Sequence, residues 1–179
     1  MKLIIVTGMP GAGKSEVADA FKDTQFPVLV MGDIVRKEAR NRGLEPNREN
    51  TRLVMLDLRD KDGLGAIAMR CVPELKRIES EIVLIEGCRS ISEIDVFDDY
   101  AKELTLVAVH ASPRTRFARL QKRNRDDAPD EWSSFRERDL REISVGLGGV
   151  IALSDVMLVN ESSLESFRES IDKLVRSFL

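Results

Sequence analysis

The chain has 179 residues, of which 42% are hydrophobic, so it can bury a substantial core, and we expect one domain with an insertion or two. Its formal net charge of -3 argues against general nucleic-acid binding but is compatible with a local basic pocket. No apolar run approaches the length of a membrane span, no signal-peptide pattern precedes the first predicted strand, and two cysteines are too few for a disulfide framework, so the cytoplasm is the simplest compartment.

The first predicted elements are a strand, a glycine-rich turn and a helix. Residues 3–6 form a short apolar run rich in β-branched side chains, which is typical of a buried strand. Residues 16–22 place apolar side chains at helical spacing. The turn between them matches the phosphate-loop pattern G-x-x-x-x-G-K-[ST] at every fixed position. It consists of Gly8, Met9, Pro10, Gly11, Ala12, Gly13, Lys14 and Ser15.

This loop predicts a binding site for nucleotide phosphates. Its glycines let backbone N–H groups turn toward phosphate oxygens, and the N-terminus of the following helix adds partial positive charge. We expect Lys14 to reach the β- and γ-phosphates and the Ser15 hydroxyl to hold Mg²⁺. A glycine-rich turn without a ligand does not require a Lys-Ser pair between a strand and a helix, so the sequence favours the nucleotide site.

The next segment is predicted to be a short strand followed by helices alone. Residues 26–31 read as a second buried strand, and Asp33 is expected to cap the helix that begins at Ile34. From there to about residue 80 the sequence shows only helical patterns, separated by two glycine-containing turns. The third of these helices contains Pro73, which can kink or break it.

Strands and helices then alternate to the end of the chain. Because each strand is a continuous apolar run, we expect a parallel sheet covered by helices on both faces. Ligands in such folds bind at the carboxyl ends of the strands. The remaining strands are predicted at residues 82–85, 104–109 and 156–159, and the remaining helices over 92–102, from Ser112-Pro113 onward, through a charged stretch ending near 144, and over 162–178.

Two acid–arginine pairs follow predicted strands and are therefore placed at the nucleotide site. Arg36 and Arg89 are expected to clamp the phosphate of an acceptor through bidentate hydrogen bonds. Glu86 can either anchor a water bound to Mg²⁺ or accept a proton from an acceptor hydroxyl. Asp33 is the alternative base. The sequence leaves these two assignments open.

Further arginines lie on later helices. Arg119 and Arg123 are four residues apart, hence on one helical face, where both can reach the donor phosphates. Arg136, Arg138 and Arg141 lie on a segment that could close over the site. A single exposed helix arginine more often forms a solvated ion pair, so these residues carry less weight than Arg36 and Arg89.

These motifs resemble those of the P-loop nucleoside monophosphate kinases, and more closely those of an archaeal family related to adenylate kinase and dephospho-CoA kinase. Residues 32–36 are similar to the adenylate kinase segment Gly-Asp-x-x-Arg, whose Arg binds the acceptor phosphate. Residues 86–89 resemble its Asp-Gly-x-x-Arg, with Glu in place of Asp. Residues 119–123 resemble the Arg-x-x-x-Arg that opens the lid, and residues 138–142 resemble the Arg-Asp-x-x-Glu element of the archaeal family.

The resemblance covers nearly the whole chain and implies the α/β, three-layer fold of P-loop NTPases, with a five-stranded parallel sheet in the order 2-3-1-4-5. It implies one P-loop kinase domain over residues 1–179, composed of a core (1–32, 81–123, 145–179), an acceptor-binding helical insertion (33–80) and a lid (124–144). ATP with Mg²⁺ would be the donor, and a nucleoside monophosphate or a coenzyme precursor the acceptor. Catalytic roles are implied for Lys14, Glu86, Arg89, Arg123 and Arg138.

The chain departs from adenylate kinases where the acceptor is read. Those enzymes place a Gln that reads adenine four residues after the matching Arg, whereas this chain has Glu93. A carboxylate only accepts hydrogen bonds, so it suits the guanine edge or the amino group of cytosine better than the mixed edge of adenine. Val30-Met31 also replaces the Ser-Thr pair that touches the acceptor nucleoside. We therefore expect an acceptor-binding role for Glu93 and leave the acceptor open.

Two classes of function remain. The first is a small-molecule kinase, a monomer or small homo-oligomer with no strong nucleic-acid signal. The second is an ATP-hydrolysing switch or assembly factor that acts on a macromolecular partner. No Asn-Lys-x-Asp motif follows the fourth predicted strand, which disfavours a guanine-specific switch. Arg36 and Arg89 discriminate the two classes, because only a kinase needs them for acceptor-dependent turnover.

Overall fold

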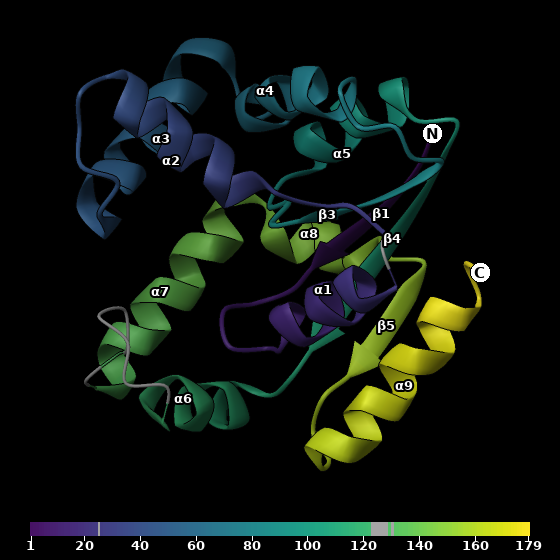
Figure 1. Cartoon of the computed structure of the whole chain (residues 1–179). Helices are drawn as coiled ribbons and strands as arrows, with labels where there is room; N and C mark the ends of the chain where they lie inside the picture. Colours follow the sequence, from purple (N-terminus) through teal and green to yellow (C-terminus); the bar gives the residue numbers. More distant parts are fainter. Residues whose placement is uncertain (25, 123–128, 130) are drawn as a thin grey trace.

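The computed structural model describes residues 1–24, 26–122, 129 and 131–179, in which five parallel strands carry helices on both faces (Figure 1). The strand order is β2-β3-β1-β4-β5, which confirms the predicted topology. The strands are β1 (Lys2–Thr7), β2 (Val28–Val30), β3 (Ile82–Glu86), β4 (Glu103–His110) and β5 (Val156–Val159). The helices are α1 (Lys14–Asp23), α2 (Met31–Asn41), α3 (Arg48–Asp62), α4 (Ala66–Leu75), α5 (Ile91–Tyr100), α6 (Pro113–Lys122), α7 (Trp132–Val145), α8 (Leu147–Ala152) and α9 (Leu164–Arg176).

The register of the central strands brings the predicted site residues together. Strand β1 lies between β3 and β4, and its residue Val6 pairs with Glu86 of β3. Glu86 pairs in turn with Val30 at the end of β2. The phosphate loop after β1, the turn after β3 and the start of α2 therefore share one edge of the sheet, as the strand-end rule requires.

Each face of the sheet buries its own apolar layer. Leu3 and Ile5 of β1 pack in one layer with side chains of α2, α3, α4, α5 and α8. Ile4 and Val6 point to the opposite face and pack in a second layer with side chains of α1 and α9. This alternation follows from the two-residue period of a strand and explains why every position of β1 after Lys2 is buried. Figure 1 shows α9 and the α2–α4 region at opposite ends of the fold.

The start of α2 differs from the prediction. The helix begins at Met31, with the extended residue Val30 at its N-cap position, so Asp33 lies in the first turn and does not cap the helix. A carboxylate in the first turn is still favoured by the helix dipole. Its side chain pairs with Arg36, one turn later on the same helix. The second strand is correspondingly shorter than expected, at Val28–Val30.

The helices α2, α3 and α4 pack against one another and fill the predicted insertion. Pro73 lies inside α4, which ends two residues later at Leu75. A second Pro-containing signal, Ser112-Pro113, opens α6 as expected. Among the helices described, none is both long and apolar enough to cross a membrane. The boundaries of the insertion and the lid as functional units remain predictions.

The layer beneath α5 gives a test of the packing. Phe97 is fully buried there, so Phe97→Ala should lower the free energy of unfolding by about 3–5 kcal/mol, from lost transfer energy and the cavity left behind. Leu164→Ala, at an exposed position, is the matched control and should change it by less than about 0.5 kcal/mol. Urea denaturation measures both. Equal losses would contradict the assigned packing.

Candidate functional site

A cavity of about 620 Å³ extends from the phosphate loop to α2 and α3. This volume is in the range of small-molecule sites. In a chain of net charge -3, the described residues of its walls include eight cationic and three acidic side chains. They are Lys14, Arg36, Arg48, Arg52, Arg59, Arg89, Arg138 and Arg141, with Glu86, Glu93 and Glu142. Such an excess of positive charge in a cleft favours a ligand with several negative charges.

Two buried side chains brace the phosphate loop from behind. Arg116 donates through Nη1 to the carbonyl oxygen of Pro10 at 3.2 Å, and Asn160 donates through Nδ2 to the carbonyl oxygen of Ala12 at 2.9 Å. The Asn160 Oδ1 accepts from Nη2 of Arg119 at 3.1 Å, so Arg119 lies behind the loop next to Asn160, and its donor-phosphate role remains a prediction. Because these carbonyl groups are bonded, the loop is held in its conformation before a ligand arrives.

Close packing around the phosphate loop explains two of its glycines. A Cβ atom at Gly8 would collide with the carbonyl oxygen of Val109, and one at Gly13 would collide with the amide of Asn160. Both residues have positive φ, which side chains rarely adopt. The loop therefore requires glycine at both positions for two independent reasons.

Lys14 is the residue most affected by this environment. Its Nζ donates to the carbonyl oxygens of Gly8 and Met9 at 2.8 and 3.3 Å. Burial lowers the pKa of Lys14 to about 8, an effect that Glu86 opposes and Arg89 reinforces. Phosphate oxygens would bring negative charge next to the buried Lys14 amine and stabilise its protonated form. Nucleotide binding and protonation of Lys14 therefore favour each other.

The donor set of the loop fits magnesium bound with a phosphate. Ser15 is the second residue of α1, and Glu86 ends the neighbouring strand β3. The residues that the structure describes contain no cluster of three or more His, Cys, Asp or Glu suited to a metal. Mg²⁺ normally takes one or two protein oxygens and completes its shell with water and phosphate, which matches this pair.

The two predicted acceptor arginines both line the cavity. Arg36 pairs with Asp33 at 2.5 Å between Nη2 and Oδ1, and its side chain is 40% exposed. Arg89 lies 3.5 Å from Glu142 between Nε and Oε2, and its Nη1 is 3.6 Å from the sulfur of Met55. Both side chains retain enough exposure to meet an anion that enters from solvent.

Glu93 is more enclosed than a residue that reads a ligand would need to be. Its side chain is fully buried, and Oε1 pairs with Nη2 of Arg59 at 3.1 Å. Its Oε2 accepts from the backbone N–H of Arg89 at 2.7 Å, which fixes the turn after β3. The predicted contact between Glu93 and an acceptor would have to share these oxygens, so that role remains a prediction.

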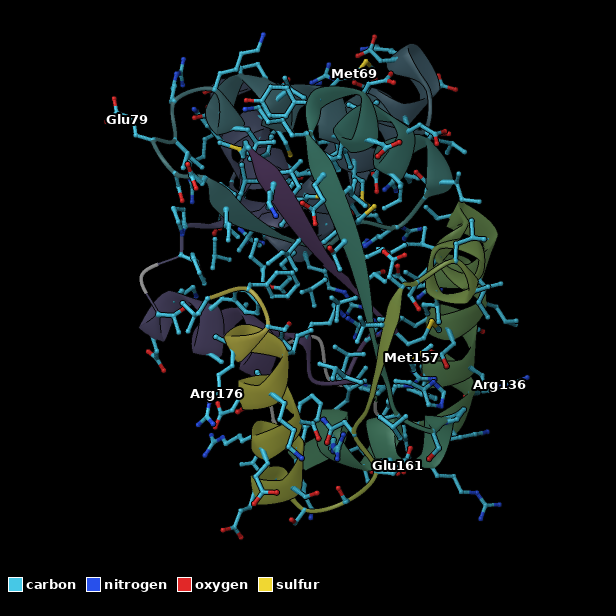
Figure 2. All side chains as sticks on the ribbon, turned by 90° about the vertical axis from the view of Figure 1, so that its right-hand side faces the viewer. Met69, Glu79, Arg136, Met157, Glu161 and Arg176 are labelled. Atoms are coloured by element: carbon cyan, nitrogen blue, oxygen red, sulfur yellow. The ribbon has the colours of Figure 1, made fainter. Side chains whose placement is uncertain are left out.

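The predicted lid residues divide into three groups. Arg138 and Arg141 on α7 line the cavity, whereas Arg136 lies on the outer surface of the same helix (Figure 2). Helix α7 is anchored by Asp139, which makes a bidentate pair with Arg116, and by Glu142 on Arg89. Arg123 and residues 124–128 lie outside the described part of the chain.

Three residues of the site escaped the sequence analysis. Asn160 directly follows β5, so the strand-end rule applied to the last strand would have found it. Arg59 and Arg116 are buried charges inside amphipathic helices, and no local pattern distinguishes them from surface arginines. The two cysteines need no role here, since burial raises the pKa of Cys71 to about 12 and that of Cys88 still further, so both remain protonated.

Two solved structures share this fold across almost the whole chain. TT1252 from Thermus thermophilus superposes with a TM-score of 0.67 at 19% identity and covers 99% of this chain and 97% of its own. A shikimate kinase from Bacteroides thetaiotaomicron superposes with a TM-score of 0.60 at 14% identity and covers 98% and 97%. At these identities the likeness establishes the fold alone, which is that of the P-loop kinases.

The sequence comparisons are closer. The family model described as AAA domain matches residues 7–136. A UPF0200 protein of Hyperthermus butylicus is 47% identical over 97% of this chain and 92% of its own length. A UPF0200 protein of Methanocaldococcus jannaschii, MJ1399, is 43% identical over 100% and 91%. These matches confirm the resemblance to kinase-related P-loop proteins: the chain belongs to the UPF0200 family and carries an AAA-type phosphate-loop domain on a P-loop kinase fold.

Proposed function

We propose that the protein is a phosphotransferase that moves the γ-phosphate of ATP, bound with Mg²⁺, to a nucleoside monophosphate or a similar phosphate-bearing small molecule. The observation that carries this proposal is the continuity of the cavity, which joins the phosphate loop to Arg36 and Arg89. A nucleotide hydrolase activates water and needs no binding site for an anionic acceptor, whereas a second cationic subsite in the same cavity suits such an acceptor.

The proposed site residues divide between the two substrates. Lys14 and Arg119 lie at the loop and serve the donor phosphates, while Arg36 and Arg89 hold the acceptor phosphate. Arg138 lines the cavity near Lys14 and Arg89, where it stabilises charge on the transferred group, with Arg123 in the same proposed role. Glu86 acts as base or metal-water anchor. Mg²⁺ held by Ser15 and Glu86 would neutralise phosphate charge.

The first test measures ATP consumption with Mg²⁺ in the presence of AMP, GMP, CMP, UMP, dephospho-CoA or no acceptor, with the product identified by mass. The proposal predicts that at least one acceptor raises turnover about 100-fold or more above the rate without acceptor. A slow rate that no acceptor changes would refute the kinase and favour the alternative switch or assembly factor.

The arginine clamp predicts a selective loss. Arg36→Ala and Arg89→Ala should each lower acceptor-dependent kcat/KM by about 100-fold, since each removes a charge-assisted contact to the acceptor phosphate. Basal ATP hydrolysis should persist, because the phosphate loop is intact. Arg77→Ala is the control, since Arg77 is exposed at the end of α4 and pairs with Glu74. Steady-state kinetics with varied acceptor measures all three, and unchanged acceptor kinetics would refute the clamp.

Lys14 predicts a pH dependence of nucleotide affinity. Because its pKa is lowered to about 8 by burial, the amine loses its proton as pH rises through that value and no longer attracts phosphate. The dissociation constant of a non-hydrolysable ATP analogue with Mg²⁺ should be flat below about pH 7.5 and rise by up to about tenfold per pH unit above 8. Calorimetric titration of wild type and Lys14→Met checks this, and the variant should bind weakly without that rise. A rise of equal slope in both would assign the titration to another group.

Trp132 should report ligand-induced movement of α7. Its ring contacts Phe117 and Phe135, with centroids 5.3 and 5.1 Å away. Since Glu142 of α7 pairs with Arg89, a phosphate bound to Arg89 competes for this contact and shifts the helix. Adding the ATP analogue and an acceptor should therefore change tryptophan emission. The acceptor's own absorbance is controlled with free N-acetyltryptophanamide, and an unchanged emission at saturation would exclude the movement.

A further inference from the structure

A buried ion pair lies at the acceptor end of the cavity and is not used by the phosphate chemistry above. Arg59 of α3 and Glu93 of α5 both line the cavity, and their side chains are 7% and 0% exposed. Burying two charges is costly, so such a pair contributes little net stability of its own.

The hydrogen bonding of Arg59 is incomplete. A guanidinium carries five N–H bonds, and only Nη2 finds a partner, Oε1 of Glu93. In the part of the chain that the structure describes, Nε and Nη1 are buried and have no hydrogen-bond partner. Buried donors are nearly always satisfied, and Arg59 is a residue of the cavity wall, so a ligand with acceptor oxygens beside it would satisfy the N–H bonds that Arg59 leaves unpartnered.

The charge of the pair indicates which kind of group this is. Glu93 already neutralises Arg59, so a second carboxylate there would add an unbalanced negative charge beside a buried one. A neutral carbonyl oxygen accepts two hydrogen bonds without adding charge. Glu93 itself is bonded at both oxygens, by Arg59 and by the N–H of Arg89, which leaves it few sites for ligand donors. The pair as a whole is rich in donors.

The rest of this cavity suits a ring. Apolar side chains from α3, α4 and α8 line it, namely Met55, Ile67 and Leu147. A flat heterocycle can bury its faces against such side chains while its edge meets the few polar groups. The phosphate of the same molecule would extend toward Arg36 and Arg89.

We propose that Arg59, with Glu93, makes the site selective for acceptors whose ring carries carbonyl oxygens: 6-oxopurine and 4-oxopyrimidine nucleoside monophosphates over their amino counterparts. This inference rests on the proposed kinase function. An amino group in place of the carbonyl would put a donor against a donor and leave Arg59 unsatisfied, so the amino compounds are rejected.

The test compares acceptors that differ in the carbonyl or amino group and in the proton on the adjacent ring nitrogen, IMP with AMP and UMP with CMP. In wild type, kcat/KM with ATP and the binding constant without ATP should both favour the oxo member by about tenfold or more. Arg59→Lys keeps a positive charge beside Glu93 but loses the planar fork, so the preference should fall below about threefold while KM for ATP is unchanged. Arg70→Lys is the control: Arg70 lies on α4, bonds Ala66 and Asp62, and lies outside the cavity wall, so its preference should equal that of wild type.

The outcomes separate this inference from the kinase proposal. Transfer to AMP or CMP as efficient as to IMP or UMP overturns the carbonyl selection and keeps the kinase, and this comparison needs only wild type. If 3-phosphoglycerate is used better than any nucleotide, the group beside Arg59 is a carboxylate. That result also overturns the carbonyl selection. Oxo-selective binding without transfer supports the inference and rejects the kinase. If the protein binds no nucleotide at all, both the carbonyl selection and the kinase proposal are rejected.

Discussion

The phosphate loop depends on its carbonyl groups being bonded from behind. Arg116 and Asn160 donate hydrogen bonds to the carbonyl oxygens of Pro10 and Ala12, and the loop also lines the cavity. The backbone N–H groups at the start of a helix have no intrahelical acceptors and remain available to an anion. Both braces are themselves held, Arg116 by Asp139 and Asn160 by Arg119, so the anion site is organised before a nucleotide binds.

The same brace links the site to α7. Arg116 contacts the loop and Asp139 at once, while Glu142 from one turn later on α7 contacts Arg89 on the acceptor side. Helix α7 thus contacts residues at both ends of the cavity through Asp139 and Glu142. Any movement of α7 would therefore reach both Arg89 and the phosphate loop through direct contacts, without a long pathway.

The fold and the phosphate loop could be predicted because their signals are local: apolar runs for strands, and a fixed spacing of Gly, Lys and Ser. The predicted start of α2 is wrong. Val30 is the extended residue at the N-cap position, and the Asp33 carboxylate pairs with Arg36 and does not cap the helix. The braces could not be predicted, because Arg116 and Asn160 lie 106 and 148 residues from the carbonyl groups they bind. Packing alone brings such distant partners together.

This long-range closure has a consequence for the order of assembly during synthesis. During synthesis the phosphate loop leaves the ribosome before Asn160, which donates a hydrogen bond to the Ala12 carbonyl oxygen, and before α9, which packs in the same layer as α1. Strand β1 likewise needs β3 and β4 on its two sides. The nascent chain therefore carries its phosphate-loop motif before the contacts that brace this loop can form, and the last of these contacts form only after Asn160 and α9 have emerged.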